Sequence, residues 1–472
     1  MSGADLRRYL AGRRPEQIEE LLGFLRIESV STQPEHRDDM RRAAAFVAGQ
    51  LRAAGFGEVE ILETGGHPVV WAEHVVGPEA PTVLIYGHYD VQPPDPLELW
   101  TSPPFVPTIL GGRIYARGVS DDKAPLYIAL QALRALRDLQ GGPRCNVRVL
   151  AEGEEEMGSV HLAPTVVAHR DRFAADLVLS ADGAMWRPGE PSLTLSAKGL
   201  CGLEVRVRTA DQDLHSGRHG GGVPNALHAL AEILAGLHDA DGRVQVQGFY
   251  DRVRPLTAGD RAEIAALDFD EDQYRQSLGI AELTGEAGYS TLERQWARPT
   301  LEVNGMGGGY QGAGGKTVVP REAFAKITCR LVPDQEPEEV VALVRAEIAR
   351  RAPRGARVEV AEEGGRSRPY RMPADHPVLP LAAEVLLEAM GRAPVRVRMG
   401  GTEPCAELFL SAFGAPTLFF SFSTVDEQYH APNEFFRLER FDQGLVAWTE
   451  LLRRLPEVLR PKGSLPQEEA EV

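Results

Sequence analysis

The sequence predicts an α/β protein in which a mainly parallel sheet, covered by helices, is interrupted by a second, α+β domain. Before residue 197, short and almost wholly apolar segments alternate with amphipathic helical segments. Strands with this composition are covered on both faces, as in parallel sheets packed between helices. Between residues 197 and 373 the strands instead alternate apolar and polar side chains, which predicts an open antiparallel sheet with one wet face.

Apolar residues at helical spacing predict the helices of both domains. A glycine follows Met40–Ala54 and Leu126–Gln140, at the position where a helix ends in the left-handed conformation. The predicted helices are Met40–Ala54, Leu126–Gln140, Ala226–Leu237, Glu338–Ala352 and Val378–Met390. The predicted buried strands are Thr82–Tyr86, Asn146–Leu150, Asp176–Ser180 and Thr417–Ser421, and the half-exposed strands are Leu203–Arg208 and Ala325–Leu331.

The change of strand pattern also predicts the domain boundaries. Residues 1–196 and 374–472 are expected to form one domain, and residues 197–373 are expected to be inserted into it. Residues 241–299 form a long, mixed, acidic stretch without a clear assignment. The glycine-rich segment Gly307–Gly312 neither follows a clear strand nor opens a helix, so a flexible loop is expected there rather than a phosphate-binding loop.

Charge and cysteine content exclude several classes of protein. The 472 residues include 51 Lys and Arg against 68 Asp and Glu, and this net charge of −17 argues against nucleic acid or an anionic membrane as main partner. The four cysteines form no CxxC pair, which excludes a disulfide framework and a thiolate zinc ribbon. No apolar leader opens the chain, and Leu408–Val425 is interpreted as a helix end, a turn and a buried strand rather than a membrane span. A cytoplasmic protein is therefore expected.

Side chains capable of binding metal follow the apolar strands at the point where each strand ends. His88 and Asp90 follow the first strand, and Glu154–Glu156 follow the second. Asp182 follows the third strand, and His430 lies in the loop after the last. Ligands of open α/β sheets gather beyond the carboxyl ends of the strands. Two histidines with several carboxylates suit Zn, Mn or Co, and a carboxylate-rich set suits a pair of metals.

Each of these residues taken alone also has a purely structural interpretation. Asp121 opens a predicted helix, where Asp is normally an N-cap, and a run of Glu is usually a solvated charge run. A single His after a strand, such as His88, is more often a satisfied polar residue than a ligand. These structural interpretations are less convincing when the residues are considered together, because all of them are predicted to lie at the same end of the same sheet. The HExxH, GxSxG and Walker A motifs are absent from the sequence, which excludes three other common hydrolase sites.

Seven motifs resemble those of the M20 family of metallopeptidases, and most of all its dipeptidase branch, which includes carnosinase-like enzymes. They are GHYD, ARGVSDDK, EGEEEMGS, SADGAMW, DLHSG, CRLVP and HAPNE, and they run in family order from residue 87 to residue 434. The resemblance implies a zinc-peptidase-like catalytic domain with an inserted lid or dimerisation domain. It also implies a homodimer that acts on small peptides.

The resemblance further implies two divalent metal ions and assigns five ligands to them. His88 and Asp182 would bind one ion, and His430 and Glu156 would bind the other. Asp121 would bridge the two ions. Zn is the first expectation, with Mn or Co as alternatives, because all three accept these ligands.

Two further acids are expected to act beside the metals. Asp90 lies two residues after His88 on the same side of an extended segment, where it can accept the ring N–H and fix the tautomer. Glu155 would be the general base that activates a metal-bound water and passes its proton to the leaving amine. The family spacing E-G-x-E-E-x-G-S leaves Glu154 at the variable position.

The inserted domain is expected to contribute substrate contacts. His215 matches the family histidine that stabilises the developing oxyanion, and in related dimers this histidine reaches the partner's active site. Arg330 lies on the wet face of its strand, where it can hold a substrate carboxylate in a bidentate pair or be an ordinary exposed arginine. Asn225, Thr317 and Thr402 match further family positions near the substrate.

The leading functional hypothesis is a binuclear metal-dependent hydrolase that cleaves dipeptides or short peptides with a free C-terminal carboxylate. Within the same chemistry, an N-acyl amino-acid deacylase or a carboxypeptidase is the alternative. The long stretch at residues 241–299 enlarges the inserted domain and favours the dipeptidase branch. A binding protein that kept only the fold is the non-catalytic alternative, and the intact set of proposed ligands argues against it.

Overall fold

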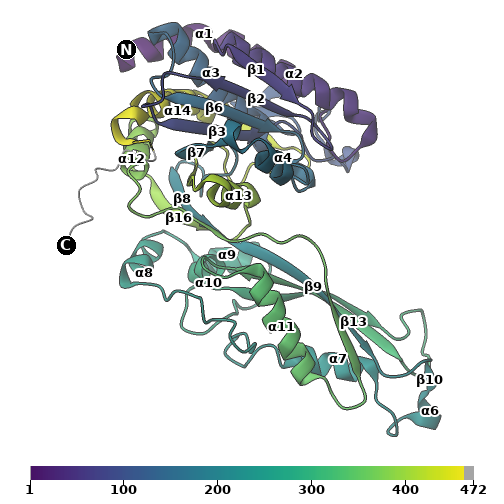
Figure 1. Cartoon of the computed structure of the whole chain (residues 1–472). Helices are drawn as coiled ribbons and strands as arrows, with labels where there is room; N and C mark the ends of the chain where they lie inside the picture. The colour runs from purple at the N-terminus through teal and green to yellow at the C-terminus, as the bar shows by residue number, and fades with distance from the viewer. Residues whose placement is uncertain (1, 462–472) are drawn as a thin grey trace. The chain divides into compact units, whose positions relative to one another are not determined.

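The computed structural model describes residues 2–461, which divide into two compact units (Figure 1). The first unit comprises Met1–Thr194, Met372–Val397 and Leu408–Val472, and the second comprises Leu195–Arg371 and Arg398–Glu407. The last segment differs from the predicted boundaries, which assign residues 374–472 to the first domain. It belongs with the second unit because the Lys198 backbone N–H donates to the Gly401 carbonyl at 2.8 Å and the Arg398 guanidinium pairs with Asp260.

A six-stranded sheet forms the centre of the first unit. Its order is β1 (Glu58–Leu62), β2 (Val69–His74), β6 (Asn146–Glu152), β3 (Thr82–His88), β7 (Leu177–Ser180) and β17 (Thr417–Phe419). The four strands from β6 to β17 run parallel, whereas β1 and β2 are antiparallel at one edge. Nearly every residue of β3 and β7 is buried. The predicted fold class, a mainly parallel sheet with helices, is confirmed.

Helices pack against this sheet, and short strands complete the unit. α2 contacts β1 and β2, α3 contacts β3, and α5 contacts β6. The helices are α1 (Gly3–Leu25), α2 (Arg37–Ala53), α3 (Ala124–Gln140), α4 (Leu162–Ala168), α5 (Arg170–Phe173), α12 (Val378–Met390), α13 (Pro404–Phe413) and α14 (Leu438–Val458). The short strands are β4 (Thr108–Leu110), β5 (Arg113–Tyr115) and β18 (Phe435–Arg437). The unit boundaries fall inside α13 and inside the strands β8 (Ser192–Ala197) and β16 (Val395–Met399).

The least charged stretch of the sequence folds as predicted. α13 ends at Phe413, Gly414 turns the chain with a φ of +68°, and the buried strand β17 follows. Within residues 2–461, the structure contains no helix both long and apolar enough to cross a membrane.

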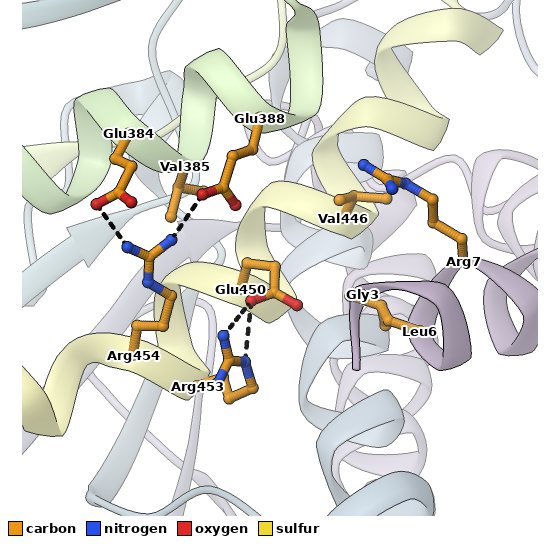
Figure 2. A pocket seen from close by; sticks show the side chains of 10 residues that line it. All are labelled: Gly3, Leu6, Arg7, Glu384, Val385, Glu388, Val446, Glu450, Arg453 and Arg454. Atoms are coloured by element: carbon orange, nitrogen blue, oxygen red, sulfur yellow. Dashed lines mark hydrogen bonds and ion pairs between the residues drawn. The ribbon is translucent and has the colours of Figure 1, made fainter. Parts of the chain in front are cut away.

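A pocket on the surface of the first unit is lined by α1, α12 and α14 (Figure 2). Arg454 of α14 pairs with Glu384 and Glu388 of α12, at 2.6 and 3.2 Å. Arg453 pairs with Glu450 one turn earlier on its own helix. These arginines are engaged by glutamates of the pocket wall, so the pocket is part of the α12–α14 contact.

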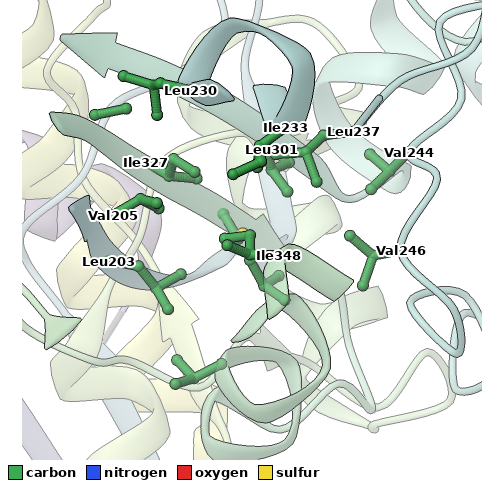
Figure 3. Packing of buried hydrophobic residues seen from close by; sticks show 14 of the residues in the cluster. Leu203, Val205, Leu230, Ile233, Leu237, Val244, Val246, Leu301, Ile327 and Ile348 are labelled. Atoms are coloured by element: carbon green, nitrogen blue, oxygen red, sulfur yellow. The ribbon is translucent and has the colours of Figure 1, made fainter. Parts of the chain in front are cut away.

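The second unit contains an antiparallel sheet with one apolar face. Its order is β11 (Thr300–Gly308), β13 (Glu322–Leu331), β9 (Gly199–Arg208) and β14 (Arg357–Glu362). Helices α7 (Ala226–Ala235) and α11 (Pro337–Arg351) pack against it. Leu203, Val205 and Ile327 of the sheet meet Leu230 and Ile348 of these helices in one buried cluster (Figure 3). The predicted alternation of buried and wet residues is therefore confirmed.

The stretch that the sequence left unassigned forms three short helices, each capped by a side chain. They are α8 (Ala258–Ala265), α9 (Glu271–Ser277) and α10 (Thr291–Ala297), with N-caps Thr257, Asp270 and Ser290. The remaining elements are β10 (Leu214–His215), α6 (Ser216–His219), β12 (Val318–Val319) and β15 (Tyr370–Arg371).

The expectation of a loop over the glycine-rich segment is wrong at its first residues. Gly307 and Gly308 close strand β11. A Cβ on Gly307 would lie 2.8 Å from the Phe324 ring of the neighbouring strand. The glycine therefore marks a close approach between two strands, which the sequence pattern alone does not reveal.

Replacing Ile327 by Ala is expected to destabilise the second unit by about 2–5 kcal/mol, because the buried side chain leaves a cavity between the sheet and its helices. Urea denaturation followed by circular dichroism measures the change. Ile280→Ala is the matched control, since this isoleucine of the same unit is 41% exposed and should change stability by less than about 1 kcal/mol. Equal losses in both variants would contradict the assignment of this core.

Candidate metal centre

The candidate ligands lie together because the parallel strands end at one edge of the sheet. His88 is the last residue of β3 and is paired in register with Glu152, the last residue of β6. Ser180 ends β7 opposite Tyr86, and Asp182 follows two residues later. The predicted convergence at the carboxyl ends of the strands is therefore present in the structure.

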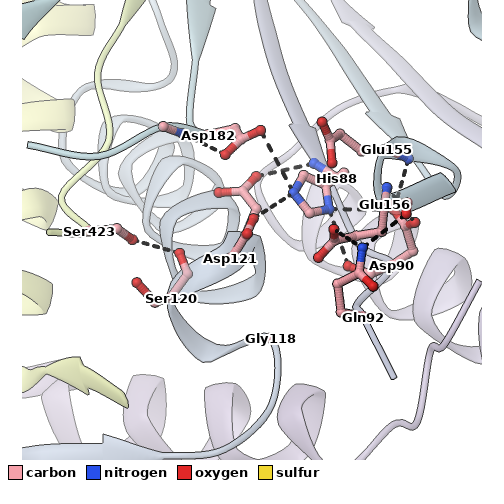
Figure 4. A network of polar contacts seen from close by, with 12 residues as sticks. His88, Asp90, Gln92, Gly118, Ser120, Asp121, Glu155, Glu156, Asp182 and Ser423 are labelled. Atoms are coloured by element: carbon pink, nitrogen blue, oxygen red, sulfur yellow. Dashed lines mark hydrogen bonds and ion pairs between the residues drawn. The ribbon is translucent and has the colours of Figure 1, made fainter. Parts of the chain in front are cut away.

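Two groups of three side chains converge on a shared aspartate (Figure 4). The Nε2 atom of His88 lies 3.0 Å from Asp121 Oδ1 and 3.7 Å from Asp182 Oδ2. The Nε2 atom of His430 lies 3.0 Å from Asp121 Oδ2 and 3.1 Å from Glu156 Oε2. Asp121 thus presents one oxygen to each histidine.

The donor atoms of each group suit a divalent cation. Within a group, the candidate atoms all lie within 4.8 Å of one another. Ligands at about 2.1 Å from a tetrahedral ion stand about 3.4 Å apart, which is close to the separations measured between these histidine and carboxylate atoms. One imidazole nitrogen and two carboxylate oxygens per group form the hard and borderline donor set that Zn, Mn and Co share.

The same contacts shift the pKa values of these groups. Hydrogen bonds to Asp121 and Glu156 raise the pKa of His430 to about 10. Burial alone would lower the pKa of His88, but hydrogen bonds to Asp121 and Asp90 raise it well above its usual value. Burial raises the pKa of Asp121 less than its bonds from both histidines lower it, so that pKa is depressed. The histidines therefore stand in a strongly anionic environment, which is what a bound cation requires.

Two other acids have raised pKa values, in contrast to Asp121. Burial raises the pKa of Asp182 to about 6, and the nearby His88 opposes this rise. Burial also raises the pKa of Glu155 well above its usual value, with Asp182, Asp121 and Glu156 adding repulsion. A raised pKa makes a carboxylate a stronger base, which is the property that a general base requires.

The three consecutive glutamates separate into different environments. The Glu154 carboxylate is buried and accepts the backbone N–H groups of His67 at 3.0 Å and His161 at 3.1 Å. Glu156 belongs to one of the convergent groups, and Glu155 lies next to it. The structure thus gives Glu154 a local structural role, as the family spacing implied.

Asp90 contacts more than the predicted imidazole. The Nδ1 atom of His88 lies 3.1 Å from the main-chain oxygen of Asp90 and 3.4 Å from its Oδ1 atom. The Asp90 carboxylate also accepts the backbone N–H groups of Glu155, at 3.3 Å, and Glu156, at 3.1 Å. Asp90 therefore orients the histidine on one side and the glutamate pair on the other.

The predicted substrate residues lie at two separate places in the second unit. Arg330 Nη1 donates to Thr402 Oγ1 at 2.6 Å, which brings these residues together. His215 is exposed, and the next residue donates its N–H to the Thr317 carbonyl at 3.0 Å. Asn225 Oδ1 accepts the N–H groups of Leu227 and His228 and caps α7.

The structure does not bring His215 and Arg330 together. His215 pairs with Val318 of β12, which precedes β13, whereas Arg330 lies near the far end of β13. Figure 1 shows β10 and α6 beyond one end of the β9–β13 pair. Eight residues separate Glu322 from Arg330, which corresponds to roughly 27 Å along an antiparallel strand.

Gln92 and Glu434 are among the buried or half-buried residues near the ligands that were not predicted. Gln92 Nε2 donates to Glu156 Oε2 at 2.9 Å and to its main-chain oxygen at 3.0 Å. Gln92 continues the two-residue spacing of His88 and Asp90, and this periodicity could have indicated it. The Glu434 carboxylate accepts the backbone N–H of Asp121 at 3.2 Å, a contact between residues far apart in sequence that no local pattern indicates.

Comparisons with known proteins agree with this geometry. Residues 84–454 match the peptidase family M20/M25/M40. The chain is 28% identical to the Beta-Ala-His dipeptidase of Mus musculus, over 92% of each chain. It is 30% identical to the cysteinylglycine-S-conjugate dipeptidase of Corynebacterium striatum, over 84% of this chain and 85% of that one.

A solved structure shows the same fold. The M20 family metallo-carboxypeptidase Sso-CP2 of Sulfolobus solfataricus superposes with a TM-score of 0.81 at 33% identity, and the match covers 94% of this chain and 99% of that one. The matched range also includes all five convergent side chains, from His88 to His430. The chain therefore belongs to the peptidase family M20/M25/M40.

Proposed function

We propose that this protein is a binuclear metal-dependent dipeptidase that cleaves the amide bond of dipeptides or short peptides with a free C-terminal carboxylate. The observation that carries the proposal is the Asp121 carboxylate between His88 and His430, with the half-buried Glu155 close by. The dipeptidases among its relatives support the substrate class. Zn is the proposed metal, with Mn and Co as alternatives.

The five convergent residues would hold the two ions. His88 and Asp182 would bind one ion, His430 and Glu156 the other, and Asp121 would bridge them, which accounts for its two histidine contacts. Bound cations would supply Lewis-acid polarisation of the scissile carbonyl and ease the deprotonation of water near neutral pH.

Glu155 and Asp90 perform the proton chemistry and the positioning. Glu155 Oε accepts a proton from the attacking water and returns it to the nitrogen of the departing amine. Its raised pKa favours the protonated form between these two steps. Asp90 fixes the backbone N–H of Glu155 and orients the ring of His88, so that Nε2 faces Asp121.

The second unit would bind the substrate. Arg330, held by Thr402, pairs with the terminal carboxylate through a charge-assisted hydrogen bond. Asn225 uses its oxygen to cap α7, so its amide N–H₂ group is the part that faces a substrate. Thr317 and His215 form a separate group, in which His215 stabilises the oxyanion of the tetrahedral intermediate.

This separation supports a homodimer through the second unit. A dipeptide spans only about 7 Å, whereas His215 lies beyond the Glu322 end of β13 and Arg330 lies roughly 27 Å further along that strand. One chain therefore does not offer both residues to the same dipeptide, but a twofold dimer can combine the Arg330 of one chain with the His215 of its partner. We also propose a cytoplasmic location, consistent with four cysteines that form no disulfide.

Replacing Glu155 by Gln is expected to lower kcat by about 10²- to 10⁴-fold, because the amide cannot accept the proton of the attacking water. Metal content should stay at the wild-type value, since Glu155 is not a proposed ligand. Steady-state kinetics and elemental analysis measure the two quantities. Glu98→Gln, at an exposed glutamate of the same unit, is the control and should keep turnover. Wild-type activity in the Glu155 variant would refute the assignment of the base.

A carboxypeptidase is the second candidate function, because the similar Sulfolobus solfataricus structure carries that name. A panel of dipeptides, longer peptides and N-acetyl amino acids separates the functions by kcat/KM, and dipeptides are expected to be best. Amidating the C-terminus of the dipeptide substrate should lower kcat/KM by about 10- to 100-fold, because the group that pairs with Arg330 loses its negative charge. Arg330→Met should abolish this discrimination. A preference for long peptides would favour the carboxypeptidase.

Mixing two inactive variants tests whether His215 acts across the dimer. His215→Ala should lower kcat by about 10²- to 10³-fold. When His215→Ala and Glu155→Gln chains are refolded together, each mixed dimer regains one intact site, so activity should return to roughly a quarter of wild type. If His215 served its own chain, the mixture would stay as inactive as its components, and the proposed dimer site would be wrong.

A further inference from the structure

Glu434 stands at the centre of a hydrogen-bond cradle beneath Asp121. Its buried carboxylate accepts Arg117 Nη1 at 2.7 Å and the Gly118 backbone N–H at 2.8 Å through Oε2. Its Oε1 atom accepts the backbone N–H groups of Ser120 at 2.8 Å and Asp121 at 3.2 Å. The Glu434 carbonyl also accepts the N–H of Ala116 at 3.2 Å. Residue 434 thus contacts the whole turn that carries Asp121.

The turn has the shape of an anion-binding nest, and its anion comes from the protein itself. Gly118 adopts a φ of +76°, and the backbone of Asp121 is non-helical at φ −128° and ψ 93°. This conformation directs successive N–H groups to one side, where they can surround a carboxylate. Figure 4 shows Gly118, Ser120 and Asp121 on this turn, with the Asp121 side chain directed at His88.

The same residue also connects Asp121 with the segment of His430. His430 lies four residues before Glu434, with a φ of +61°, and Asn433 has a φ of +64°. Asn433 fastens this segment by accepting the Thr101 N–H at 2.7 Å and donating to the Leu99 carbonyl at 2.9 Å. Glu434 therefore joins the His430 segment to the backbone N–H groups of the Asp121 turn by side-chain hydrogen bonds.

A counter-ion for Arg117 is the competing explanation for Glu434. Arg117 is almost fully buried and stacks over the Trp100 ring at 5.4 Å, so it requires an anion. This pairing occupies only one carboxylate oxygen, and Gly118 shares that oxygen. The other oxygen accepts the N–H groups of Ser120 and Asp121. A residue that served only as the counter-ion of Arg117 would not need these two hydrogen bonds.

We propose that Glu434 is a positioning residue: its carboxylate orders the Gly118–Asp121 turn and so holds the Asp121 carboxylate between His88 and His430. This inference rests on the proposed two-metal function and adds the residue that fixes the bridging ligand. A glutamine at this place keeps the volume but turns an N–H₂ group toward donors, so at least one N–H of the turn loses its acceptor. The turn then shifts, and Asp121 no longer faces both histidines.

The test uses the full-length protein loaded with two equivalents of Mn²⁺. In the wild type, a carboxylate bridge makes the two ions exchange-coupled, which electron paramagnetic resonance detects. Glu434→Gln is expected to bind at least one Mn²⁺ on the order of 10- to 100-fold more weakly and to show the signal of isolated ions. Isothermal titration measures the affinity without reference to activity. A coupled signal and wild-type affinity in the variant would overturn the proposal.

Two further variants separate positioning from stability. Arg117→Met/Glu434→Gln removes both charges, so it should recover Tm relative to Glu434→Gln while its signal stays uncoupled. A coupled signal in this double variant would show that Glu434 serves only Arg117.

Glu427→Gln is the matched control, because Glu427 is equally buried but contacts the Ser120 hydroxyl and Arg437. The Glu427→Gln variant should keep the coupled signal. Loss of the coupled signal in this variant would also overturn the specific role of Glu434. A wild type without coupling would overturn the two-metal function itself.

Discussion

The contact of one carboxylate with two histidines is the constraint on which the site depends. Asp121 lies between His88 and His430, which come from opposite ends of the sequence. Four acids crowd this small region, and their mutual repulsion would drive them apart without opposing charges and N–H donors. The sheet supplies the fixed frame, because the register of β3 and β6 sets the strand ends side by side. Asp90 then orients His88 on one side and the backbone of Glu155 and Glu156 on the other.

Most of the sheet and most of the convergent side chains could be predicted from the sequence, because the strands and the residues that follow them form local patterns. Apolar runs predicted β3, β6, β7 and β17, and the residues after them supplied four of the five convergent side chains. Contacts between distant residues could not be predicted in this way. Neither the cradle around Glu434 nor the attachment of Arg398–Glu407 to the second unit leaves a periodic signal. Gly307 was misjudged because a close approach between strands looks like a loop in the sequence alone.

In the second unit, two of the predicted substrate residues, His215 and Arg330, lie at opposite ends of one sheet. Cys201 to Val207 and Ala323 to Leu331 bury alternate side chains against α7 and α11, which leaves the other face for charged groups. Arg330 lies at one end of this sheet, and the His215 segment lies at the other. A rigid sheet keeps the two groups at a constant separation, which is why a single short substrate cannot use both within one chain.

The interruption of the first unit also sets the order in which the chain can fold during synthesis. β7 ends at Ser180 and its parallel neighbour β17 begins at Thr417, a gap of 417 − 180 = 237 positions. At about 5–20 residues per second, a ribosome needs at least ten seconds or so to cross this gap. The inserted unit emerges whole during that interval, while the first sheet still lacks its last strand. His430 emerges later still, so the nascent chain cannot complete its metal centre until translation is almost finished.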